Sequence, residues 1–133
     1  MLLEKEIQKI LDELTLAESA KIDLGGSSIT IKVFDNATKI FLSTPVYLGG
    51  NYIPKSVRNC LKQKAPFDTL NIRTTLEVEE EKFEIFLKFV GLVEQMTKQK
   101  FIDLLEDFSW LAEKWRDYLD ENDKKDLLHI HAS

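Results

Sequence analysis

Residues 101–122, FIDLLEDFSWLAEKWRDYLDEN, decide the fold, because their spacing predicts one long amphipathic helix. At roughly 100° per residue, the apolar side chains of such a helix gather on one face. That face carries Phe101, Leu104, Leu105, Phe108, Leu111, Ala112, Trp115 and Leu119. An apolar face of this width has to be covered by a sheet or by other helices. We therefore expect the segment to anchor the hydrophobic core.

Trp110 lies on the opposite face of the same helix, among charged residues. Its neighbours there are Asp103, Glu106, Asp107, Glu113, Lys114 and Asp117. Two interpretations are open: the indole lies along the stems of these neighbours, or it contacts a second protein, as exposed tryptophans at binding hot spots do. Trp110 is therefore a candidate contact for a partner.

The rest of the chain switches between a helical period and a period of two. The patterns predict an amphipathic helix at 3–14, strands at 20–24, 29–34 and 40–46, a short helix opened by Pro54, and strands at 70–78 and 83–89. Gly25-Gly26 marks a turn between the first two strands. The order α-β-β-β-α-β-β-α favours an α+β domain whose antiparallel, twisted sheet is packed by the terminal helices.

The predicted elements form one domain. We expect this domain to cover residues 1–122, because a chain of this size buries a single core. Residues 123–133 are polar and predict a C-terminal tail that frays after Leu128.

The composition excludes several classes of function. The 133 residues are 44% hydrophobic and 31% charged, which is ordinary for a folded protein. A net charge of −5 argues against direct nucleic-acid binding, which needs a basic surface to displace counterions from phosphates. Residues 1–10 alternate apolar with charged side chains and predict no signal peptide. No apolar run approaches the roughly 20 residues that span a bilayer. We expect a soluble, cytoplasmic protein without membrane insertion.

Groups that carry catalysis are scarce. Both histidines, His129 and His131, fall in the predicted tail, where a pair without fixed carboxylates is a weak metal signal. Cys60 lies among lysines with no histidine to activate it, which favours a small buried or interface side chain. The glycine pairs match neither a P-loop nor a dinucleotide motif. We therefore predict no enzyme, no metal site and no cofactor.

Aromatic residues are predicted on a sheet face that should be exposed to solvent. If the terminal helices cover one face, then Phe34, Phe41 and Phe86 lie on the other. Either these side chains are covered by one another or by the second helix, or they form a surface for a partner protein.

Three stretches of the chain resemble the class I type III secretion chaperones, which are small acidic dimers that hold an effector before export. Residues 29–54, ITIKVFDNATKIFLSTPVYLGGNYIP, are similar to that family's hairpin, Leu-Gly turn and proline-opened helix. Residues 74–90, TTLEVEEEKFEIFLKFV, resemble its pair of long strands, and residues 101–119 resemble its closing helix. The resemblance spans residues 2 to 121.

The resemblance implies a bacterial, non-catalytic chaperone that binds an unfolded effector segment and keeps it competent for export. Strand addition and apolar pockets would hold the segment without ATP. The implied effector-binding residues are Leu3, Ile7, Ile22, Leu24, Phe34 and Phe41. The implied dimer interface uses Val57, Cys60, Leu61, Leu70 and Ile72.

The second helix departs from the family pattern. Residues 55–64, KSVRNCLKQK, are basic with a thin apolar stripe, so like charges would meet across the two-fold axis of a homodimer. A heterodimer with a sister chaperone is the alternative to a homodimer. Chlamydial members that resemble this arrangement pair in that way, and one is associated with control of RNA polymerase. The alternative function is therefore a transcription regulator that binds RNA polymerase or a sigma factor; a small enzyme completed by a partner is a third interpretation.

Overall fold

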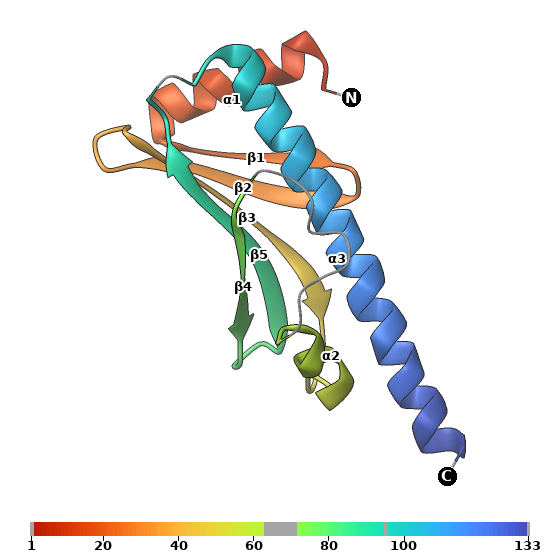
Figure 1. The fold of residues 1–133 in the computed structure, drawn as a ribbon. Helices are drawn as coiled ribbons and strands as arrows, with labels where there is room; N and C mark the ends of the chain where they lie inside the picture. The colour runs from red at the N-terminus through yellow and green to blue at the C-terminus, as the bar shows by residue number, and fades with distance from the viewer. Residues whose placement is uncertain (1, 63–71, 95, 133) are drawn as a thin grey trace.

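A computed structural model describes residues 2–62, 72–94 and 96–132, with side chains described as far as Lys124 (Figure 1). The elements are α1 (Glu4–Ala17), β1 (Ser19–Leu24), β2 (Ser27–Phe34), β3 (Lys39–Leu48), α2 (Lys55–Cys60), β4 (Thr74–Glu79), β5 (Glu84–Leu92) and α3 (Lys98–Ala132). The predicted order of helices and strands is confirmed.

The five strands form one antiparallel sheet in the order β1-β2-β3-β5-β4. β3 pairs with β5 rather than with β4, so that β1 and β4 lie at the two edges. The pairing shifts between Pro45 and Tyr47, where proline cannot donate a ladder hydrogen bond. The strand continues past this irregularity to Leu48.

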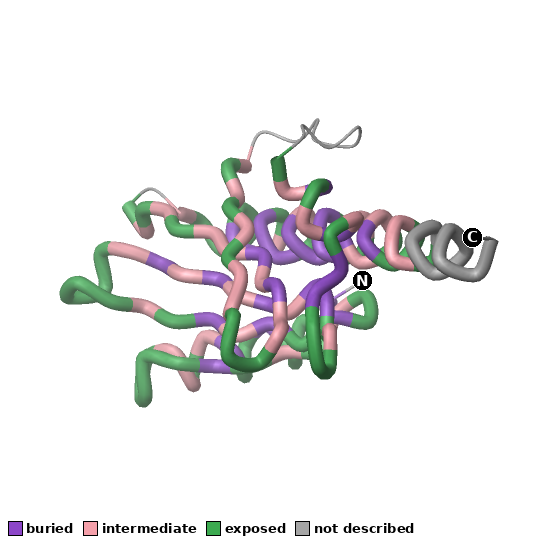
Figure 2. The backbone as a smooth tube through the Cα atoms, turned by 90° about the horizontal axis from the view of Figure 1, so that it is seen from below, coloured by how far each residue is buried: buried purple, intermediate pink, exposed green. Residues whose placement is uncertain are grey.

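One face of the sheet, here called the inner face, is packed by α1 and α3. α3 contacts β3 and β2, and α1 contacts β1 and β2. Figure 2 shows buried positions gathering where α3 lies along the strands. All eight apolar residues predicted for the inner side of the closing helix are buried. Each large side chain among them contributes about 1.5–3 kcal/mol through burial, so this contact dominates the core.

Two polar side chains of α3 tie the helix to the β1–β2 turn. The Ser109 Oγ donates a hydrogen bond to the Leu24 carbonyl oxygen at 3.0 Å. The Arg116 guanidinium donates to the Gly25 carbonyl oxygen at 2.8 Å and to the Ser27 hydroxyl. The turn is the predicted Gly25-Gly26 pair, and both glycines have positive φ. This left-handed backbone suits a two-residue hairpin, and it lets the turn approach α3 closely.

Two element boundaries differ most from the sequence prediction, while those of α1 and of the other strands differ by three residues or fewer. β4 begins at Thr74, so Ile72 precedes the strand, and Leu70 lies outside the described residues. α3 runs to Ala132, so the segment predicted as a fraying polar tail continues the helix. The Tyr47 hydroxyl donates to the Asp123 carboxylate at 3.2 Å, a contact across the start of that segment.

Replacing Gly25 by alanine should destabilise the fold by about 2–3 kcal/mol. The new Cβ would require a strained φ of +60° and would clash with the Ser109 Oγ. Gly50 is the matched control, because its φ is +75° but nothing surrounds it, so Gly50→Ala should cost about 1 kcal/mol. Urea unfolding measures both. Equal losses for the two variants would contradict the close approach of α3 to the turn.

Candidate functional site

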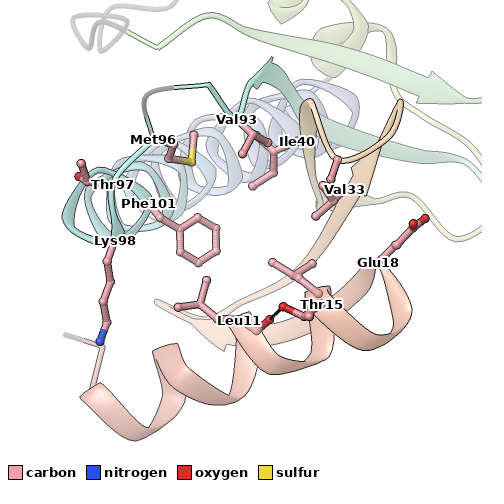
Figure 3. Close-up of a pocket in the computed structure, with 12 residues that line it drawn as sticks. Leu11, Thr15, Glu18, Val33, Ile40, Val93, Met96, Thr97, Lys98 and Phe101 are labelled. Carbon is pink, nitrogen blue, oxygen red and sulfur yellow. Dashed lines mark hydrogen bonds between the residues drawn. The ribbon is translucent and has the colours of Figure 1, made fainter.

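A groove of about 500 Å³ lies between the second half of α1, the ends of β2 and β5, the start of β3 and the start of α3. Figure 3 shows side chains from all these elements turned toward the same space. Its apolar lining consists of Leu11, Leu14, Val33, Ala37, Ile40, Val93, Met96 and Phe101. Thr15, Glu18, Thr97 and Lys98 add polar groups to this lining. The volume is in the range of natural ligand pockets.

The packing of α1 explains why the groove is open. Its first half is fixed by Ile7 and Ile10, which are buried in the core. One turn later, Leu11 and Leu14 are only half-buried, because they face the groove. The helix ends at Glu18 in a left-handed conformation, and the Glu18 carbonyl oxygen accepts a hydrogen bond from the Val33 N–H at 2.9 Å. α1 is therefore held at both ends while its apolar flank is partly uncovered.

The groove can bind apolar groups, but its lining offers little for catalysis. Among the described residues, Glu18 and Lys98 are the only ionisable side chains that line the groove, and Lys98 forms an ion pair with Glu4. No three His, Cys, Asp or Glu side chains among the described residues are arranged to hold a metal ion. The side chains of His129 and His131 lie outside the described set. No described helix is long and apolar enough to cross a bilayer. The chemistry of the groove is that of a binding site for bulky apolar side chains.

Groups with shifted pKa values lie away from the groove. Burial raises the pKa of Asp107, and the charges of Asp103 and Glu106 raise it further. Burial also raises the pKa of Asp120, with a contribution from Asp123. On α2, the Arg58 guanidinium donates two hydrogen bonds to Glu80 at 2.8 and 3.2 Å and lowers the pKa of that carboxyl. These shifts reflect acid clusters and one surface ion pair.

The implied effector-binding residues do not form one site. Ile7 is fully buried in the core, so it offers no surface to a partner in this structure. Ile22 and Leu24 are half-buried on the inner side of β1, next to core residues. Leu3 is exposed before α1. Phe34 and Phe41 lie together on the outer face, the sheet face turned away from α3. Their assignment to effector binding stays a prediction.

The sequence pattern does not distinguish the groove residues on α1 from the core residues of the same helix. The sequence pattern of Leu3, Ile7, Ile10, Leu11 and Leu14 predicts the helix and its apolar side correctly. It does not separate Ile7 and Ile10, which are buried, from Leu11 and Leu14, which are partly open. Val93 and Met96 were missed altogether, because they follow β5 in a connection without periodicity.

The implied dimer residues on α2 are occupied within the monomer. Val57 and Cys60 are buried, and α2 packs against α3. The Cys60 thiol donates to the Ser56 carbonyl oxygen at 3.3 Å. Leu61 and Ile72 are half-buried beside the core, and Leu70 lies outside the described residues. A dimer through α2 stays a prediction, and it would have to use the exposed side of this helix.

Trp110 is 38% exposed on the acidic side of α3. The Lys114 Nζ lies 5.6 Å from the centre of its ring, within the range of a cation–π contact. This geometry favours the interpretation in which the indole packs along a neighbouring stem. More than a third of the side chain stays open, so a partner contact at Trp110 stays a prediction as well.

The fold recurs in solved structures of chaperone and secretion complexes. A chain of the HopA1–SchA chaperone–effector complex aligns with a TM-score of 0.59 at 12% sequence identity, covering 87% of this chain and 99% of that chain. A chain of the ExsC–ExsE complex aligns with a TM-score of 0.60 at 15% identity, covering 90% of this chain and 97% of that chain. A chain of the heterodimeric ExoU–SpcU complex from the type III secretion system of Pseudomonas aeruginosa aligns with a TM-score of 0.56 at 11% sequence identity. The alignment covers 77% of this chain and 84% of that chain.

No protein-family model and no curated protein sequence matches the chain. The structural likeness covers most of this chain and nearly all of two of the neighbours. The chain therefore has the α+β fold of the type III secretion chaperones, as the resemblance in its sequence implies.

Asp107→Asn should stabilise the protein at pH 7. The folded pKa of Asp107 is raised above its ordinary value of 3.8, so ionisation of this carboxyl opposes folding. The penalty is absent below pH 3.8 and is complete above the folded pKa. The melting temperature of the variant should exceed that of the wild type at pH 7, and the difference should vanish at pH 3. A difference independent of pH would contradict the electrostatic cause.

Trp110→Ala should change the free energy of unfolding by no more than about 1 kcal/mol, because the side chain lies outside the core. Thermal unfolding measures this. A much larger loss would show that the outer side of α3 is buried and that the assigned face is wrong.

Proposed function

We propose that the chain is a type III secretion chaperone that binds an unfolded segment of a secreted effector and keeps it competent for export. The observation that carries the proposal is the open apolar groove of about 500 Å³ beside α1, in a fold shared with a chaperone–effector complex. Bulky side chains of an extended segment would enter this groove, and no catalytic step is required.

The sheet edge next to the groove supplies the second half of the mechanism. Among the described strands, β1 pairs only with β2, so the backbone N–H and C=O groups of its other side can pair with an incoming strand. Such a segment would gain about 1.5–3 kcal/mol for each large apolar side chain that it buries. Ordering it costs about 2–5 kcal/mol in total, so two or three anchored side chains are needed for binding. Side chains held in the groove are unavailable for the effector's own core.

Pairing with a second chaperone extends the proposal. The exposed side of α2 carries Lys55, and Lys62 is exposed in the turn that follows the helix, whereas Val57 and Cys60 are already buried. Two copies meeting through these basic surfaces would repel each other. We therefore favour a heterodimer with a more acidic sister chaperone over a homodimer, with both partners acting in the bacterial cytoplasm.

A second candidate function rests on the other side of α3. Trp110 is exposed there among Asp103, Glu106 and Asp107, a surface suited to a basic protein partner. This surface favours a transcription regulator that binds RNA polymerase or a sigma factor as the alternative.

Co-purification from the native cells separates the two functions. Recovery of a secreted protein or a second chaperone supports the first proposal, whereas RNA polymerase subunits alone favour the second. A strictly monomeric protein that recovers no protein partner would contradict both.

Leu14→Glu should weaken capture of the secreted protein at least about tenfold. A carboxylate in the apolar lining would lose the burial of a leucine and would itself be desolvated, and about 1.4 kcal/mol suffices for a tenfold loss. Leu16→Glu is the matched control, because Leu16 is on the same helix, is 87% exposed and does not line the groove. Pull-down with quantification measures capture, and thermal unfolding verifies that both variants are folded. Equal capture by the two folded variants would exclude the groove as the binding site.

A further inference from the structure

A contiguous apolar surface lies on the outer face of the sheet, at the end formed by the β2–β3 turn. The strand register places its residues in two rows. Phe34 pairs with Lys39, which pairs with Leu92. In the next row, Lys32 pairs with Phe41, which pairs with Val90. Side chains that are directly opposite lie about 4.5–5.5 Å apart on one face. We call Phe34, Phe41, Val90 and Leu92, with Lys32, Lys39 and Lys88, the outer patch.

The outer patch is unusually open for sheet residues of this kind. Val90 is 57% exposed, Leu92 62% and Phe34 40%. The solvated face of an antiparallel sheet normally carries polar side chains at such positions. α1 and α3 pack on the inner face and α2 packs on α3, so none of the described helices covers the outer patch. An exposed apolar cluster rimmed by polar groups marks an interaction site.

Lysines determine what kind of partner the outer patch fits. Lys32 is exposed and takes part in no ion pair among the described residues. Lys88 lies 5.8 Å from the centre of the Phe41 ring and pairs with Glu77, and Lys39 pairs with Asp35. Lys32 thus places one positive charge, without an acidic partner in the described part of the chain, beside the apolar side chains, whereas Asp35 and Glu77 offset the charges of Lys39 and Lys88. Carboxylates next to apolar side chains complement this arrangement.

The acids of the same face limit the size of the partner. A hollow of about 320 Å³ adjoins the outer patch, and Glu77 and Glu79 line its far side. An extended anionic surface, such as a membrane or a nucleic acid, would meet these carboxylates. A short segment would end before them. Three strands about 4.8 Å apart and rows about 6.6 Å apart leave room for roughly two to three helical turns.

We propose that the outer patch docks a short, acidic amphipathic segment of a partner protein, with apolar side chains on Phe41, Val90 and Leu92 and a carboxylate toward Lys32. This proposal rests on the proposed function, because the partner is the protein chain that the groove binds. It adds a second binding site, separate from the groove, for an acidic and apolar segment of that chain. Because the surface is small, the contact is a weak one that strengthens capture already achieved at the groove.

Two synthetic peptides test the proposal directly. Both are designed as helices about 10 residues long, which is just under three turns, with the same leucine and phenylalanine face; one has glutamates and the other lysines at the polar positions. Fluorescence anisotropy with the full chain should show binding of the glutamate peptide and at least about tenfold weaker binding of the lysine peptide. Val90→Glu and Lys32→Glu should each weaken binding of the glutamate peptide at least about tenfold. Leu16→Glu, at an exposed leucine of α1 on the inner side of the sheet and outside the patch, should leave binding unchanged.

Several results would overturn the proposal. Failure of the glutamate peptide to bind, equally strong binding of both peptides, or unchanged binding in Val90→Glu would each contradict the outer patch as the docking site. Loss of self-association in Val90→Glu would instead assign the patch to an interface between copies. Binding of the wild type, but not of Val90→Glu, to phosphatidylglycerol vesicles would assign it to a membrane. Val90→Thr keeps a β-branched side chain, so it should preserve the strand. It should still weaken binding of the glutamate peptide, which would show that the loss comes from the missing contact and not from altered folding.

Capture of the native partner distinguishes this proposal from the proposed function. Capture that is lost in Leu14→Glu but unchanged in Val90→Glu would leave the chaperone function standing and would refute the outer patch. Reduced capture in both variants would support both sites.

Discussion

The packing of α3 against the inner face of the sheet is the contact on which the rest of the structure depends. It buries the apolar side of α3 on β2 and β3, and Ser109 and Arg116 fix the helix to the β1–β2 turn. Because α3 occupies the middle of the inner face, α1 is placed beside β1. There Ile7 and Ile10 are buried in the core, whereas Leu11 and Leu14 are only partly buried. The groove is a consequence of this division of one sheet face between two helices.

The same arrangement explains why the chain suits binding better than catalysis. Both long helices are used on one side, so the outer face keeps side chains such as Val90 and Leu92 in solvent. Among the described strands, β1 and β4 form the two edges of the sheet, and the groove is lined mainly by apolar groups. These are surfaces that another protein chain can complete through burial and backbone pairing. Solved neighbours share the fold at 11–15% identity, which indicates that the distribution of apolar residues, rather than particular side chains, specifies it.

Hydrophobic periodicity was sufficient to predict the order of the elements and the buried side of the closing helix, because burial selects residue type directly. It was insufficient where neighbouring apolar residues differ only in what covers them, as Ile10 and Leu11 do. Val93 and Met96 lie outside any periodic segment, so their place in the groove depends on the path of the chain. The extent of α3 was underestimated because residues 120–126, DENDKKD, are all polar, a pattern that a helix and a tail share. The position of Trp110 was predicted correctly, and the Lys114 contact shows why an indole is tolerated there.

Amide hydrogen exchange of the chain, measured alone and with its co-purified partner bound, tests the central claim most directly. The account predicts that binding increases protection in β1 and in the segments around the groove, at residues 11–18, 33–40 and 93–101. Protection confined to α2 and the acidic side of α3, with the groove segments and β1 unchanged, would contradict it.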